Sequence, residues 1–206
     1  MEDEALKAVC LYIKDRFEEE PTGHDYEHMK RVVHMAAYIG QRENANVFLC
    51  ELAAWLHDSL DPKVTQHPEQ EYLRLTNLLH AHGITKDDQQ AVWSIVDRVS
   101  YRKGKVPLSL EGKVVQDADR LDALGAIGIA RTFAFGGNRG QLLHKEKNGI
   151  VEEGTSIYHF YEKILKLPNR LNTQTAKTIA VKREQHIQTF LASFLEEWDG
   201  RDYLDK

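Results

Sequence analysis

Histidines and aspartates with the chemistry of metal ligands occur in three separate stretches of this 206-residue chain. His24 and His28 are four residues apart, so a helix would place both imidazoles on one face. An apolar run ends in the adjacent pair His57-Asp58, and the looser geometry of a helix end lets both side chains reach one cation. Asp119 lies in an otherwise apolar stretch, where a carboxylate must be paired, bound to metal or turned outward. Together these residues predict a site for a divalent cation with nitrogen and oxygen ligands.

Each of these features also has an ordinary structural explanation. His57 could cap the helix that it ends, because a cationic imidazole suits the negative end of the helix dipole. Asp58 could then lie at the surface, and Asp119 could face solvent on an amphipathic helix. The spacing of His24 and His28 is also formally the HxxxH pattern of a zinc peptidase. A peptidase site would leave His57, Asp58 and Asp119 without a role.

The elements that must position these residues are helices. Apolar residues recur at helical spacing through most of the chain, and no run of alternating residues indicates a strand. The sequence therefore predicts an all-α bundle of about eight to nine helices. We expect one domain over 1–206, with a core at about 24–135 and the helices of 156–198 packed on it. The helices are expected at about 3–18, 25–42, 47–57, 68–82, 85–99, 109–122, 123–135, 156–167 and 173–198.

Residues 136–154 interrupt this pattern with a polar, glycine-rich stretch that has no periodicity. A loop of this length in a compact domain is usually functional or disordered. It could close over a substrate, with hinges at Gly136, Gly137, Gly140 and Gly149. A disordered surface loop is the alternative.

Composition narrows the class of protein. The formal net charge of −5 argues against the basic face that duplex nucleic acid needs, but permits a small phosphorylated substrate. Cys10 and Cys50 form no CxxC motif, which is typical of a reduced, cytoplasmic protein. The acidic start at Met1–Glu4 and the lack of a long apolar run predict no secretory signal and no membrane partner. We expect a cytoplasmic monomer or homodimer.

The ordered set His28, His57-Asp58 and Asp119 resembles the H…HD…D signature of the HD superfamily of metal-dependent phosphohydrolases. The flanking residues extend this similarity, which covers nearly the whole chain and implies an HD-domain helical bundle. Some segments are similar to one bacterial branch that resembles nucleotide pyrophosphohydrolases. The matching segments are His28-Met29-Lys30-Arg31-Val32, Ala118-Asp119-Arg120-Leu121, Gly23-His24-Asp25, Gln116–Ala126, His159–Lys163 and Asn172-Thr173.

Carried over by position, the resemblance implies that His28, His57, Asp58 and Asp119 bind one divalent cation. It favours Mn²⁺, although Mg²⁺, Fe²⁺, Co²⁺, Ni²⁺ or Zn²⁺ would accept the same ligands. It implies hydrolysis of a phosphate ester or anhydride, with cleavage of a nucleoside triphosphate to monophosphate and pyrophosphate as the reaction of that branch. A metal-binding module without catalysis is the alternative to an enzyme.

Acid–base and substrate-binding roles are predicted around these ligands. Asp61 or Asp122 could position or deprotonate the attacking water. Asp61 could equally cap the turn at Pro62. A phosphate would be held by basic side chains, although any single Lys or Arg could simply be exposed. The candidates for substrate binding are His24, Arg31, Lys63, Arg102 and Lys103.

Overall fold

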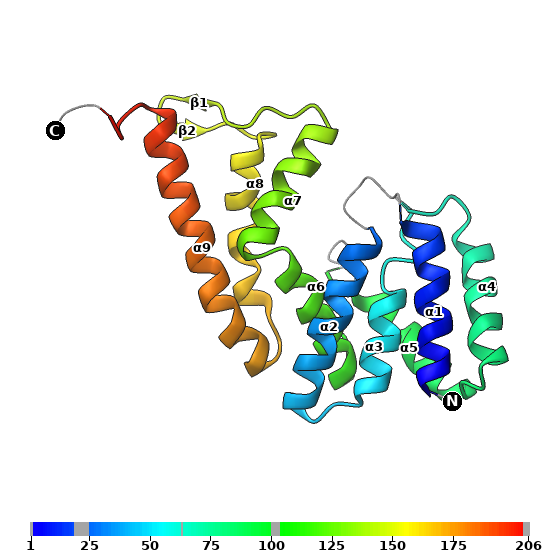
Figure 1. Ribbon diagram of the computed structural model, residues 1–206. Helices are drawn as coiled ribbons and strands as arrows, with labels where there is room; N and C mark the ends of the chain where they lie inside the picture. The colour runs from blue at the N-terminus through cyan, green and yellow to red at the C-terminus, as the bar shows by residue number, and fades with distance from the viewer. Residues whose placement is uncertain (1, 19–24, 63, 100–103, 204–206) are drawn as a thin grey trace. The chain divides into compact units, whose positions relative to one another are not determined.

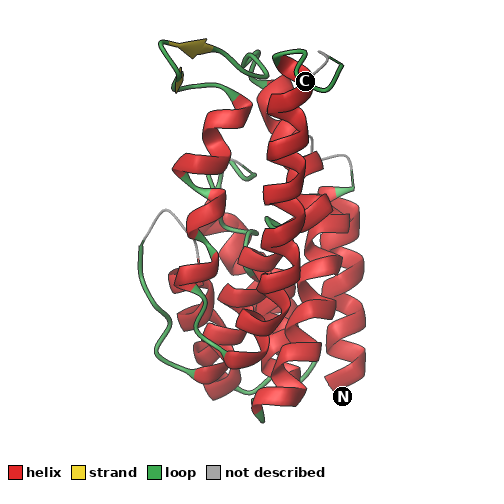
Figure 2. Ribbon diagram, turned by 90° about the vertical axis from the view of Figure 1, so that its left-hand side faces the viewer, coloured by secondary structure: helices red, strands yellow, loops and turns green. Residues whose placement is uncertain are grey.

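The computed structural model describes residues 2–18, 25–62, 64–99 and 104–203, which are mainly α-helical (Figure 1, Figure 2). The prediction of an all-α fold is confirmed. One local correction concerns strands: β1 (Glu146–Lys147) and β2 (Ile150–Val151) pair antiparallel as a short hairpin. Two residues are too few to show the alternation that reveals a strand in a sequence.

The chain divides into two compact units, of which the first contains Met1–Asp119 and Asn172–Ala176. Apart from Glu51, every residue of its α3 is apolar, which is typical of a central helix. Accordingly α3 packs against α1, α2 and α5, and α1 also packs against α4 (Figure 1). The helices of this unit are α1 (Glu2–Phe17), α2 (Tyr26–Glu43), α3 (Val47–Leu56), α4 (Pro68–Ala81), α5 (Lys86–Val99) and α6 (Leu110–Asp122) as far as Asp119.

The second unit contains Arg120–Leu171 and Lys177–Lys206. It holds α7 (Gly125–Asn138), α8 (Ser156–Glu162) and α9 (Gln174–Trp198) from Lys177 onward. It contains a cluster of one buried and three half-buried phenylalanines, with neighbouring ring centroids 5.7 to 6.3 Å apart among Phe160, Phe133, Phe190 and Phe194. The expectation of a single domain over 1–206 stays a prediction.

Local signals set several helix ends. Asp25 caps α2, and Pro68 occupies the first turn of α4. The Oγ1 atom of Thr85 accepts a hydrogen bond from the Asp88 amide at 3.1 Å, so Thr85 caps the start of α5. No helix in the described part of the chain is long and apolar enough to span a membrane.

Two expectations about the later part of the chain need correction. Gly136 and Gly137 were expected in the long loop, but they form the end of α7. Gly136 packs directly against Ser156, where a Cβ atom would clash with the hydroxyl, so it serves close packing and not hinge motion. The helix expected at 156–167 ends at Glu162 and is followed by two 3₁₀ turns, at Ile164–Lys166 and Pro168–Arg170. A lid role for the remaining loop, which keeps Gly140 and Gly149 at positive φ, stays a prediction.

Candidate metal centre

The first turn of α2 places His28 inside the first unit. The carboxylate of Asp25 accepts a hydrogen bond from the His28 amide at 2.7 Å and so caps the helix. Tyr26 stacks on Trp55 of α3, with ring centroids 5.7 Å apart. His28 is consequently fully buried, at a helix start that is fixed by both a cap and a ring contact.

The end of α3 supplies His57 and Asp58. His57 is the C-cap residue, as the capping alternative supposed, and its Nδ1 atom lies 2.7 Å from the carbonyl oxygen of Ala54. A ring nitrogen that donates to a carbonyl leaves the other nitrogen to act as a ligand. That atom, Nε2, is buried and makes no hydrogen bond with any described residue. Asp58 is buried, so the alternative of a surface position for it is wrong.

Two imidazoles and two carboxylates converge from three elements. Nε2 of His28 lies 3.6 Å from both Oδ2 of Asp58 and Oδ1 of Asp119. Nε2 of His57 lies 3.2 Å and 3.8 Å from the same two oxygens. The ligand atoms of His28, His57 and Asp119 all lie within 4.8 Å of one another. Ligands held about 2.1 Å from one ion are about 3 to 3.5 Å apart, so His28, His57 and Asp119 could hold a divalent cation. Asp58 is not part of that group of three, but its Oδ2 atom lies close to both imidazoles.

The electrostatics of the cluster favour a positive charge at its centre. Burial disfavours the charged imidazole of His57, but the carboxylates of Asp58 and Asp119 outweigh that effect and raise its pKa to about 9. Without a cation, a proton on His57 therefore balances part of the buried negative charge at neutral pH. A metal ion must displace this proton before Nε2 can act as a ligand.

The raised pKa predicts how metal binding depends on pH. The ordinary pKa of histidine is about 6.5, so the proton on His57 stabilises the metal-free fold and this stabilisation is lost as pH rises through about 9. Metal affinity changes in the opposite sense, rising about tenfold per pH unit from neutral pH and levelling off above pH 9. Chelator competition with Mn²⁺ at several pH values measures this slope. A constant affinity across that range would contradict the assignment of His57.

The other predicted site residues differ in their surroundings. Asp61 is half-buried, and its amide donates to the carbonyl of Asp58 at 3.0 Å, so it directly follows the ligand pair in a tight turn. Asp122 is buried in the second unit, where its carboxylate pairs with Arg131 at 2.6 Å. Arg31 is half-buried on α2, one turn after His28. His24, Lys63, Arg102 and Lys103 lie outside the described residues, and their roles stay predictions.

The sequence alone predicts no role for two polar residues of α6, Gln116 and Asp117. Asp117 could have faced solvent on an amphipathic helix, as could Asp119, but it is fully buried and accepts hydrogen bonds from Asn172 and Thr173. Gln116 donates to the carbonyl of Lys105 at 2.9 Å and accepts from Asn172 at 3.2 Å. The pair Asn172-Thr173 belongs to a segment that resembles the family, but no local feature of the sequence predicts its contact with α6.

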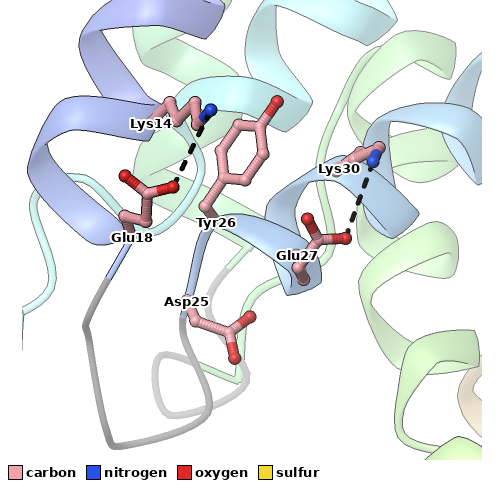
Figure 3. Close-up of a pocket in the computed structure, with 6 residues that line it drawn as sticks. All are labelled: Lys14, Glu18, Asp25, Tyr26, Glu27 and Lys30. Carbon is pink, nitrogen blue, oxygen red and sulfur yellow. Dashed lines mark ion pairs between the residues drawn. The ribbon is translucent and has the colours of Figure 1, made fainter.

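A pocket of about 400 Å³ lies where α1 and the start of α2 face each other (Figure 3). Its lysines are engaged in ion pairs, Lys14 with Glu18 and Lys30 with Glu27, both at 3.7 Å. Of the described residues, those that line the pocket include Asp25, the cap of α2, but none of the four predicted metal ligands. The pocket is therefore a feature distinct from the metal cluster.

Comparisons with known proteins identify the family of this chain and several of its relatives. The family model for the HD domain matches residues 25–124, a range that includes all four predicted ligands. The Bacillus subtilis protein YpgQ is 37% identical over 198 residues, which cover 94% of each chain. A solved HD-superfamily hydrolase from Bacillus thuringiensis is 37% identical with a TM-score of 0.80, covering 97% of this chain and 99% of the other. A structure of YpgQ in complex with ADP is 36% identical with a TM-score of 0.79, covering 95% of each chain.

Proposed function

This chain belongs to the HD superfamily of hydrolases, and we propose that it is a divalent-metal-dependent phosphohydrolase that acts on a nucleotide. One observation carries the proposal: two imidazole nitrogens and two carboxylate oxygens face one another at 3.2 to 3.8 Å in a buried cluster. We assign His28, His57, Asp58 and Asp119 as ligands of one cation. Mn²⁺ is the metal that we propose from the family resemblance, because mixed nitrogen and oxygen ligands without thiolate are compatible with it but do not select it over other divalent ions.

In this reaction the chain would orient the metal ligands, supply the negative charge that holds the cation, and provide a general base for the attacking water. A cation bound there would neutralise a phosphate oxygen and lower the pKa of a water molecule. The two carboxylates supply the negative charge that holds it, and the carbonyl of Ala54 keeps His57 in the correct orientation. We assign Asp61 as the base that accepts the proton of the attacking water. Asp122 is the weaker candidate, because its carboxylate already pairs with Arg131 at 2.6 Å.

A nucleoside triphosphate is the substrate class that we propose. The YpgQ complex with ADP supports nucleotide binding, and the net charge of −5 favours a small substrate over duplex nucleic acid. In the proposed reaction, the water oxygen bonds to the α-phosphorus while the bridging oxygen leaves with pyrophosphate. The water proton passes to Asp61, and Arg31 would contact a phosphate oxygen.

The peptidase and the non-catalytic alternatives are less well supported. An HxxxH peptidase would use His24 with His28 and would leave the other three clustered side chains unused. Family membership also favours phosphate chemistry over peptide hydrolysis. A module without catalysis would need the same cluster, so only turnover distinguishes it from an enzyme.

Product analysis tests the proposal directly. The protein is incubated in the presence of Mn²⁺ with one substrate at a time: nucleoside triphosphates, diphosphates, phosphomonoesters, cyclic nucleotides or casein. Phosphorus NMR detects the products of the phosphorylated substrates, and peptide release detects cleavage of casein. We expect pyrophosphate and nucleoside monophosphate from the wild type, and neither from Asp58→Ala. Asp15→Ala, which changes an exposed aspartate of α1, is the matched control and should remain active. If the wild type and Asp58→Ala were equally inactive on all phosphorylated substrates, the proposal that the protein is an enzyme would be contradicted.

A further inference from the structure

Asp119 is held differently from the other members of the cluster. Its side chain is 27% exposed, and within the described part of the chain its polar contacts are to the imidazoles of His28 and His57, at 3.6 and 3.8 Å. His57, by contrast, is oriented by a backbone carbonyl. Because no described donor orients Asp119, the position of its carboxylate depends on how α6 itself is held.

The opposite side of α6 carries an anchor. Asp117 lies two residues before Asp119, which places it about 200° away around the helix axis. It is fully buried, and its carboxylate accepts from the amide and the Nδ2 group of Asn172, at 2.9 and 2.8 Å. It also accepts from the amide and the hydroxyl of Thr173, at 2.7 and 2.8 Å. So many donors on one buried carboxylate fix both the rotation and the axial position of α6 at this turn.

The same short segment is bonded to α2. The hydroxyl of Thr173 accepts from the amide of Ala176 at 3.3 Å and so caps α9. The amide of Thr175 donates to Oε1 of Glu43, the last residue of α2, at 2.7 Å. Hydrogen bonds from the side chain and the amide of Thr175 lower the pKa of Glu43 and outweigh its burial, so this contact favours the charged carboxylate. Residues 172–176 are thus attached at one end to the helix of Asp119 and at the other to the helix of His28.

We propose that residues 172–176 form a brace that holds α6 and α2 at the spacing a metal ion requires, with Asp117 as its positioning residue. A rotation of α6 by only about 20° would displace the Asp119 carboxylate by about 2 Å, given the radius of a helix with its side chains. Metal–ligand distances tolerate about 0.2 Å. A helix free to turn by that amount would lose Asp119 as a ligand. This inference rests on the proposed metal centre and extends it to residues that touch neither metal nor substrate.

Three carboxylate-to-amide substitutions test the brace. Asp117→Asn weakens the hydrogen bonds between the brace and α6, and Glu43→Gln weakens the hydrogen bond between the brace and α2. Glu71→Gln is the control, because Glu71 is a buried carboxylate of α4 in the same unit, where it accepts from the Tyr12 hydroxyl at 2.8 Å. The dissociation constant for Mn²⁺ is measured by chelator competition well below each variant's melting temperature, which is recorded separately without metal.

The expected results separate positioning from general stability. Asp117→Asn should raise the Mn²⁺ dissociation constant by about 10- to 100-fold, the usual effect of removing a group that orients a ligand. Glu43→Gln should raise it by about fivefold, which corresponds to one hydrogen bond. Glu71→Gln should lower the melting temperature and leave the Mn²⁺ dissociation constant within about twofold of wild type. The substitution weakens a contact between α1 and α4, and neither of these helices carries a proposed metal ligand. The double variant Asp117→Asn/Glu43→Gln should bind Mn²⁺ about as weakly as Asp117→Asn alone, since the brace is already open.

Several outcomes would overturn the brace. One is an Asp117→Asn protein whose metal affinity changes no more than that of Glu71→Gln. Another is a double variant whose losses simply multiply, which would indicate two unrelated local effects. If Asp117→Asn does not fold, an unchanged affinity in Glu43→Gln overturns the proposal. A wild type that binds Mn²⁺ but hydrolyses no phosphorylated substrate contradicts the proposed function alone, whereas a wild type that binds no divalent cation contradicts both.

Discussion

Asp119→Ala is expected to abolish Mn²⁺ binding and to lower kcat/KM for nucleoside triphosphate hydrolysis by at least about 1000-fold. The carboxylate is one of two negative ligands in a buried cluster, and its oxygen lies 3.6 and 3.8 Å from the two imidazoles. Removing it leaves half of the negative charge that holds the cation, and the chemistry supplied by the cation is lost with it. Isothermal titration with Mn²⁺ and steady-state kinetics measure the two effects.

The controls for this prediction separate loss of metal from loss of fold. Far-UV circular dichroism of Asp119→Ala should match that of the wild type, because the side chain is partly exposed and lies near the end of α6. Treatment of the wild type with EDTA should reproduce the loss of activity, and added Mn²⁺ should restore it only in the wild type. Activity within about tenfold of wild type in Asp119→Ala would remove Asp119 from the ligand set.

Asp61→Asn is expected to lower kcat by about 10²- to 10⁴-fold, the usual effect of losing a general base. Asp61 directly follows the ligand pair in the chain and is not one of the four proposed ligands. The dissociation constant for Mn²⁺ should therefore stay close to that of the wild type. Measuring kcat and metal affinity on the same preparation distinguishes this result from that of a ligand substitution.

Asp122→Asn is the rival variant for the role of base. Asp122 pairs with Arg131 at 2.6 Å, so the substitution should lower the melting temperature and change kcat much less than Asp61→Asn does. The reverse pattern, with kcat lost only in Asp122→Asn, would assign the base to Asp122. If neither variant changed kcat by tenfold, neither Asp61 nor Asp122 would be the base.

The sequence by itself determined the helices and many of their ends. The apolar stripe expected for α2 comprises Val32, Val33, Ala36, Ala37 and Ile39, and all of these are buried except Ala37, which is half-buried. Asp25 and Thr85, which cap α2 and α5, and the proline in the first turn of α4 are residue types that favour a helix start. These features depend on residues three or four positions apart, so the information that specifies them is local.

The tertiary structure decided which polar residues meet. Asp117 and Asp119 are two positions apart on one helix and chemically identical, and each could have been exposed, paired or bound to metal. Packing assigns Asp119 to the two imidazoles and Asp117 to Asn172-Thr173, some 55 residues later in the chain. Likewise, the tertiary structure buries Asp122 against Arg131, whereas Asp61 is half-buried in the turn that follows the ligand pair.

Helical periodicity tells which side of a helix is apolar, but not which neighbour a polar residue on that helix will meet. That choice is made when segments distant in sequence pack, because a buried carboxylate is stable only where donors or a cation are brought to it. A metal-bound structure that placed the cation away from His28 and Asp119 would therefore contradict the metal site inferred from the fold.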